Sequence, residues 1–182
     1  FPSVQTLTLF GGSYVHDSYG LFFRSLFAGI GVIAILFSAP VVSKWKAGQG
    51  EFYALLMATI IGMMFMAGAN DLLMMYLALE FSSITSYIMA GFLRKNRRSA
   101  EASLKYIIYG AAASGFMIYG MSYLYGLTGT LEIHDIGRRM AEFGRENQQV
   151  SYYITLVTSV LIMAGFAYKI AAVPFHMWCP DV

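Results

Sequence analysis

Apolar residues fill five long stretches of this chain, and most of its polar residues lie between them. Each stretch is close to the roughly 20 apolar residues that an α-helix needs to cross a lipid bilayer. This pattern predicts an all-α fold, a polytopic membrane helix bundle of about five transmembrane helices that forms a single membrane domain over residues 1–182. The predicted spans are residues 21–42, 52–69, 72–92, 102–127 and 152–175.

Glycine, proline and mixed charge mark the connections between the spans. The Gly11-Gly12 pair signals a turn, and Pro40 and Pro174 should each kink or end the span that contains it. A longer polar connection separates the fourth and fifth spans, and around residues 136–143 it favours a short amphipathic helix.

The composition agrees with a membrane protein and narrows its function. Hydrophobic residues make up 58% of the chain and charged residues only 12%, a balance typical of proteins that cross the lipid bilayer several times. The net charge of +2 is too small to suggest nucleic acid as a partner. The single Cys179 excludes an internal disulfide and an all-cysteine metal site, and the three dispersed histidines form no ligand cluster. We therefore expect no metal or other cofactor in this chain.

Loop charge predicts the orientation of the helices. The loops after the first and third spans carry six cations, whereas the loop between the second and third spans carries only Asp71. The positive-inside rule therefore places the two basic loops in the cytoplasm, so that the third span runs from the outer face inward. The six cations are Lys44, Lys46, Arg94, Lys95, Arg97 and Arg98.

The third span carries a carboxylate near its middle. Placing a charge such as that of Glu80 there costs roughly 2.5–3.5 kcal/mol, so a chain that keeps it usually needs it. Tyr76, Ser83 and Tyr87 are spaced so that they share the helical face of Glu80. Two roles fit this residue: a group in a proton relay, or a buried acid that only holds two helices together.

Two further spans each carry a lysine. Lys105 lies about one turn inside the fourth span, and fits either a relay group or an interfacial lysine paired with Glu101. Lys169 lies deeper in the fifth span, and fits either a relay group or a lysine that binds carbonyls freed by Pro174. Charges about 10 Å apart at an effective dielectric of 20 interact by roughly 1.7 kcal/mol. Moving one proton would therefore change the charge state of a neighbouring group, as a relay requires.

The residues after Pro174 offer one more candidate. His176 fits either a neutral relay group or an interfacial residue that is hydrogen-bonded to the backbone at the helix break. Asp181 and Cys179 are interpreted as turn and packing residues.

Three stretches of the sequence resemble a known family. They are LALEFSSITSYIMAGF, then SAEASLKYIIYGAAASGFMIYGMSYLYGLTGT, and finally AGFAYKIAAVPFHMWCPDV. They combine an acid in one helix, a lysine after Ala-Glu-Ala, and the motif Lys-x4-Pro-Phe-His-x-Trp-x-Pro-Asp. Over nearly its whole length the chain resembles the subunit N family of the proton-pumping NADH–quinone oxidoreductase, respiratory complex I, whose members are antiporter-like membrane subunits.

The resemblance implies a fold and a set of site residues. Glu80 would match the family's buried glutamate of the fifth helix, Lys105 the lysine of the sixth, and Lys169 the lysine of the broken seventh. The family fold is an antiporter-like pair of inverted five-helix repeats with flanking helices. We expect this chain, which begins at Phe1 instead of methionine, to be a fragment with one flanking helix and most of the first repeat.

The resemblance also implies a function. The chain would be a proton-translocating membrane subunit in the inner (plasma) membrane of a bacterium, with other membrane subunits of the same complex as partners. Glu80, Lys105, Lys169 and His176 would form a proton relay coupled to electron transfer from NADH to quinone. The sequence has no glycine-rich nucleotide loop, cysteine cluster or flavin motif. NADH, FMN, the iron–sulfur clusters and quinone would therefore bind to partner subunits.

Two other functions fit the same residues. Subunits of multisubunit sodium/proton antiporters share the pairing of a membrane glutamate with membrane lysines. A structural membrane scaffold would use the same charges only to fix the packing of its helices. The lysine of the next helix and the second repeat are absent from this chain, so no complete transmembrane path is assigned to it.

Overall fold

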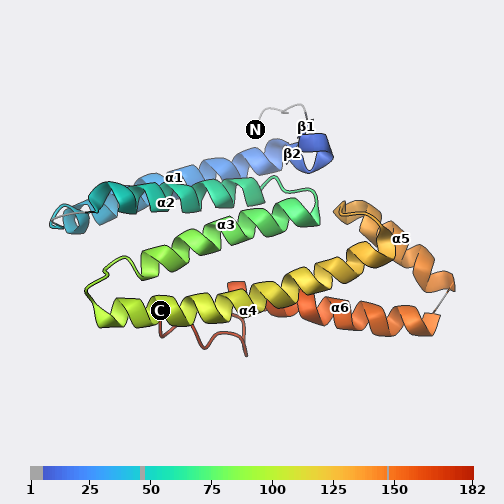
Figure 1. Cartoon of the computed structure of the whole chain (residues 1–182). Coiled ribbons are helices and arrows are strands. Elements are labelled where there is room, and N and C mark those ends of the chain that lie inside the picture. Colours follow the sequence, from blue (N-terminus) through green and yellow to red (C-terminus); the bar gives the residue numbers. More distant parts are fainter. Residues whose placement is uncertain (1–5, 46–47, 147) are drawn as a thin grey trace. The chain divides into compact units, whose positions relative to one another are not determined.

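The computed structural model describes residues 6–45, 48–146 and 148–182, and most of these residues are α-helical. Five helices within these ranges are long and apolar enough to cross a membrane, which confirms the predicted all-α fold with about five transmembrane helices (Figure 1). They are α1 (Ser18–Val42), α2 (Gln49–Met66), α3 (Leu72–Ala90), α4 (Arg97–Thr128) and α6 (Gln148–Lys169).

The chain divides into two compact units, one ending at Ser103 and the other beginning at Leu104. The division falls within α4, so this helix contributes its first two turns to the first unit. Lys46, one of the cations on which the predicted orientation rests, lies outside the described residues.

In the first unit, α2 packs closely on its neighbour α3 (Figure 1). Gly62 of α2 faces Ser82 of α3 so closely that a Cβ atom at Gly62 would collide with the Ser82 side chain. The Ser82 hydroxyl donates to the carbonyl of Thr59 over 3.3 Å, and the hydroxyls of Thr59 and Thr85 share a 2.8 Å hydrogen bond. Small and hydroxylated residues thus join the two helices, as in other membrane proteins.

A small hairpin precedes α1, and the hydrophobic pattern does not predict it. Its antiparallel strands are β1 (Leu7–Leu9) and β2 (Tyr14–His16), joined through the 3-10 turn η1 (Phe10–Gly12). Gly11 and Gly12 both have positive φ angles, +67° and +99°, which confirms the turn predicted at this pair.

The hairpin is attached to the connection between α2 and α3. Val15 donates its backbone N–H to the carbonyl of Gly68 over 2.8 Å, and Asn70 donates its N–H to Ser13 over 2.9 Å. Asp71 then starts α3, because its side chain accepts a 2.6 Å hydrogen bond from the backbone of Met74. The hairpin therefore supports the end of α3 from which the chain runs toward Glu80.

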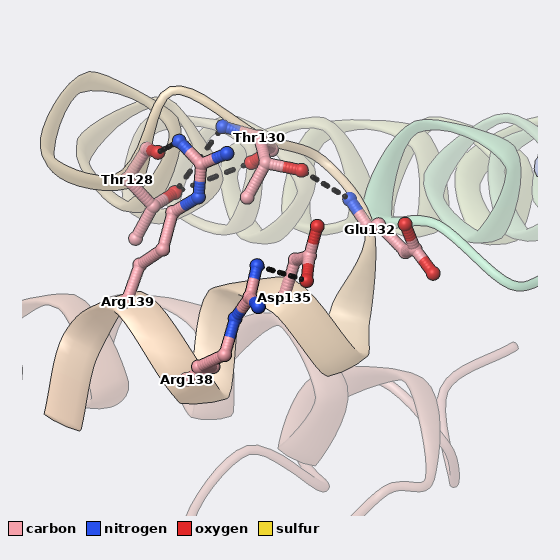
Figure 2. Close-up of polar contacts among 6 residues, drawn as sticks. All are labelled: Thr128, Thr130, Glu132, Asp135, Arg138 and Arg139. Atoms are coloured by element: carbon pink, nitrogen blue, oxygen red, sulfur yellow. Dashed lines mark hydrogen bonds and ion pairs between the residues drawn. The ribbon is translucent and has the colours of Figure 1, made fainter. Parts of the chain in front are cut away.

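In the second unit, α5 (Ile133–Glu146) follows α4 after a tight turn. Gly129, with φ +65°, donates to the carbonyl of Tyr125 over 2.7 Å, an arrangement common where helices end. Figure 2 shows Arg139 of α5 reaching back to the carbonyl of Thr128 at 2.7 Å, while Arg138 pairs with Asp135 at 3.0 Å. The amphipathic helix predicted around residues 136–143 is thus confirmed, and it is longer at both ends.

Glycines let α4 and α6 approach each other closely. A Cβ atom at Gly120 of α4 would come within 3.0 Å of Leu161, and one at Gly165 of α6 would come within 3.0 Å of the Ala113 carbonyl. Met117 fills the space between these positions and is fully buried. Close packing of small and apolar residues therefore holds the two helices together next to the parts that carry Lys105 and Lys169.

The fifth span ends earlier than the sequence predicts. The predicted span runs to residue 175, whereas α6 ends at Lys169. Ala171 adopts a left-handed conformation with φ +51°, its N–H donates to Tyr168 over 3.0 Å, and the N–H of Ala172 donates to Ala167 over 2.8 Å. This pair of bonds is the Schellman motif, which stops a helix at the residues just before it. The helix break expected near Pro174 therefore falls at the lysine itself.

Candidate functional site

Glu80 lies in the first unit, on the face of α3 that the spacing predicts. Its side chain is half-buried, whereas Ser83 and Tyr87 are buried. Tyr76 and Tyr87 both lie within electrostatic reach of the Glu80 carboxylate. The acid is thus surrounded on its own helix by hydroxyl groups, which can both donate and accept hydrogen bonds.

Lys169 occupies the last position of α6 and is half-buried. The sequence places this lysine inside a span that runs to residue 175 and breaks near Pro174, whereas the helix ends at Lys169 itself. The negative end of the helix dipole lies in this last turn, and it stabilises a cation by about 0.3–1 kcal/mol at an exposed site. A lysine therefore lies where the helix backbone changes direction.

Trp178 closes the broken end of α6. Its indole N–H donates to the carbonyl of Tyr168 over 3.0 Å, so this carbonyl accepts from both Trp178 and Ala171. The indole ring also stacks on Tyr106 of α4, with 4.6 Å between ring centroids and 10° between planes. Tyr168 completes the group by donating its hydroxyl to the carbonyl of Tyr106 over 3.2 Å.

These three rings connect the two lysine-bearing helices. Tyr106 directly follows Lys105 in α4, and Tyr168 directly precedes Lys169 in α6. The structure thus ties together the backbone beside each lysine through Trp178, within the second unit. The sequence identifies Trp178 as part of a motif, but its spacing from Tyr106 gives no sign of this contact.

Lys105 forms an ion pair with Asp181. The Lys105 Nζ atom lies 3.3 Å from a carboxylate oxygen of Asp181, and the two side chains are 40% and 56% exposed. Asp181 is therefore more than the turn and packing residue that the sequence suggests. Lys105 also lies about two turns from the start of α4 at Arg97, not one, because the helix begins earlier than predicted.

His176 lies in the segment between Lys169 and Trp178. Its side chain is exposed, and its backbone carbonyl accepts a 3.0 Å hydrogen bond from the N–H of Cys179. Three of the sequence-predicted site residues therefore lie in one connected region of the second unit, formed by α4, the end of α6 and the segment after it. They are Lys105, Lys169 and His176. Glu80 belongs to the other unit.

The chemistry available here is that of protons and charge. Across residues 6–45, 48–146 and 148–182, no group of three or more His, Cys, Asp or Glu side chains is arranged to hold a metal ion. What the region offers instead is two ammonium groups, a carboxylate and several hydroxyls in an apolar bundle. Such ionisable groups within membrane helices are costly and usually functional.

Comparison with known proteins places the chain in a family. Residues 69–182 match the family described as NADH:quinone oxidoreductase/Mrp antiporter, transmembrane. The NADH-quinone oxidoreductase subunit N of Anaeromyxobacter sp. (strain Fw109-5) is 45% identical over 100% of this chain and 35% of its own length. Subunit N of Chlorobium chlorochromatii is 42% identical over 99% of this chain and 34% of its own length.

A solved structure gives the same result for the fold. A chain of the respiratory complex I from Thermus thermophilus with bound aureothin superposes with a TM-score of 0.71 at 29% identity, over 98% of this chain and 36% of that one. The chain spans about a third of the length of the curated relatives it matches. Since the family match covers more than half of its residues, the chain belongs to the NADH:quinone oxidoreductase/Mrp antiporter transmembrane family.

Proposed function

We propose that this chain is part of a proton-translocating membrane subunit of an NADH–quinone oxidoreductase. The observation that carries the proposal is the helix break at Lys169, where a lysine-bearing helix end is tied through Trp178 to the helix that carries Lys105. A lysine at a break has carbonyls and room for water around it, which an ammonium group needs in order to gain or lose a proton within a membrane.

In the proposed relay, Lys105 and Lys169 are groups that bind and release protons. Two ammonium groups in one region of low dielectric repel each other, so protonation of one favours release from the other. Asp181 offsets the charge of Lys105 by direct pairing. His176, on the exposed segment beyond the break, would pass protons between the lysines and the surroundings of the bundle.

Glu80 joins the relay through its chemistry and its surroundings on α3. When it is protonated, the Glu80 carboxyl group, flanked by Tyr76, Ser83 and Tyr87, can hand its proton to water held by these hydroxyl groups, and the resulting carboxylate can accept another.

The rest of the complex would supply the redox chemistry. The relatives are named as subunits of NADH-quinone oxidoreductase, so we place NADH, FMN, the iron–sulfur clusters and quinone on partner subunits. We further propose that the chain lies in a bacterial inner membrane beside other membrane subunits of the same complex. It would supply one flanking helix and most of the first of two inverted repeats.

The proposal is tested by measuring proton uptake and quinone reduction together in inverted membrane vesicles that contain the full-length protein in its complex. Variants Glu80→Gln and Lys169→Ala should lower proton uptake per NADH oxidised, with the complex still assembled. Normal proton uptake in both variants would instead support a scaffold. Sodium-dependent proton movement that continues without NADH would support a sodium/proton antiporter.

A further inference from the structure

An open pocket of about 1190 Å³ lies in the first unit, lined by the ends of α2 and α3 and by the loops beside them. Leu55 and Ile88 belong to the apolar part of its lining. Its basic part consists of Arg94, Lys95 and Arg97, which follow α3 in the chain. The pocket therefore combines the two chemistries of an amphiphile in one place.

The three cations are available to a ligand. All three side chains are exposed, and within the described part of the chain none of them takes part in an ion pair. Arg97 is also the first residue of α4, whose N-terminus carries the positive end of a helix dipole. These charges favour an anion such as a phosphate, which arginine binds well in a planar, two-point geometry.

The pocket also has aromatic rings of the kind that are common at the edge of a membrane. Trp45 and Phe92 line it and stack on each other with 5.2 Å between centroids, and Phe52 meets Trp45 edge-on at 5.3 Å. Tryptophan is enriched where lipid head groups meet the hydrocarbon core. By the positive-inside rule this end of the helices lies on the cytoplasmic side, where anionic lipids attract basic residues.

We propose that this pocket binds an anionic phospholipid of the cytoplasmic leaflet, with its phosphate at the three cations and its acyl chains along the apolar lining. Free phosphate would use only the basic part and leave Leu55 and Ile88 unexplained. Glu51, the one carboxylate among the lining residues, opposes the bound anion. Its presence makes the site weaker than it would otherwise be.

The reporter for this site is Trp45, because bromine atoms on an acyl chain quench tryptophan fluorescence at short range. The full-length protein in detergent micelles is titrated with brominated phosphatidylglycerol, and the signal of Trp45 is taken as the difference from a Trp45→Phe variant. Arg94→Gln/Arg97→Gln should raise the concentration for half-quenching about 30-fold, since each interfacial cation is worth about 5-fold. Glu51→Gln should lower it a few-fold.

The matched control is Lys44→Gln/Arg98→Gln, which removes two exposed cations that neighbour lining residues in the sequence but lie outside the pocket lining. It should shift the half-quenching concentration by less than about 5-fold. An equal shift in both double variants would overturn the proposal, because surface charge alone would then explain binding. Equal quenching by brominated phosphatidylcholine, or displacement of the lipid by inorganic phosphate at matching concentration, would also overturn it. If the double variants fail to fold, the Glu51→Gln variant decides: an unchanged or weaker affinity for brominated phosphatidylglycerol would overturn the proposal.

Discussion

Trp178 lies parallel to Tyr106, with 4.6 Å between ring centroids, although 72 positions separate the two residues in the sequence. The same indole donates a hydrogen bond to the backbone one residue before Lys169. A single side chain thus connects the helix that carries Lys105 to the broken end of the helix that carries Lys169. A substitution that removes the contacts of Trp178 should therefore change the position of both lysines.

Replacing Trp178 by phenylalanine separates its two contacts. Trp178→Phe keeps a ring for stacking on Tyr106 but removes the donor to the Tyr168 carbonyl. We expect it to cost about 1 kcal/mol, the usual net worth of one hydrogen bond, and to lower the midpoint of thermal inactivation of the assembled complex. Cys179→Ser, at an exposed neighbouring position, is the control. Equal midpoints for Trp178→Phe and Cys179→Ser would show that this hydrogen bond does not support the helix end.

The sequence predicts the helices well because crossing a membrane depends on length and hydrophobicity, which are local properties. It fails where the chain's path depends on distant contacts. The apolar residues 170–173 look like a continuation of the helix, yet the backbone turns at Ala171. The indole of Trp178 then donates to the carbonyl of Tyr168, just before the turn. Tyr14 also forms an isolated β-bridge with Ala69, and the sequence around these residues does not predict it.

The candidate site shows the same division between local and distant information. Glu80, Lys105 and Lys169 stand out because charged residues are rare in apolar stretches, and that signal needs no structure. Asp181 looks like an ordinary residue of a polar turn, and only folding brings it within 3.3 Å of Lys105. The partner of a membrane lysine is therefore harder to predict than the lysine itself.

Glu80→Gln should lower proton translocation more than it lowers assembly. Glutamine keeps the volume and much of the hydrogen bonding of the acid but removes the group that gains and loses a proton. We expect at least a several-fold loss of proton uptake in vesicles, normalised to assembled complex. Glu142→Gln, at an exposed position of α5, should have no effect. Poor assembly together with normal specific activity would assign Glu80 to helix packing.

The Lys105–Asp181 ion pair is open to a charge test. Asp181→Asn leaves Lys105 without this carboxylate, so a functional pair predicts reduced proton uptake in Asp181→Asn and in Lys105→Ala alike. Lys105→Arg keeps the charge and should be milder than Lys105→Ala. Because both partners are partly exposed, the effect on stability should stay below about 1 kcal/mol. Full proton uptake in Asp181→Asn would mean that the pair has no part in translocation.

Orientation can be tested by labelling single cysteines in a Cys179→Ser background. Asn96 lies in the basic loop before α4, and His134 lies on α5; both side chains are exposed. A cysteine at position 96 should react with a membrane-impermeant reagent only from the cytoplasmic side, and one at position 134 only from the opposite side. Asn70 is a poorer site, because it is only partly exposed and its side chain donates to the Gly12 carbonyl over 2.9 Å. The reverse pattern of labelling would invert the assigned topology.

Lys169 has two possible roles, and each predicts a different ranking of its variants by proton uptake. As a structural cation at the end of α6, it would interact with the helix dipole, and arginine would replace it with little change. As a relay group it must release its proton, which a guanidinium does not do under these conditions. Stability and proton uptake therefore have to be measured on the same preparations.

For a relay lysine, we expect Lys169→Arg to keep the thermal stability of the assembled complex while losing proton uptake nearly as severely as Lys169→Ala. Lys169→Ala should in addition lower stability by about 0.3–1 kcal/mol, the usual contribution of a cation at a helix C-terminus. Ala171→Gly is a useful comparison, because glycine relieves the left-handed backbone at φ +51° and should stabilise the same helix end without touching the ammonium group. Proton uptake that follows stability across these three variants would make Lys169 a fixed counter-charge. Loss of proton uptake in Lys169→Arg alongside unchanged stability is the result expected for proton exchange at this lysine.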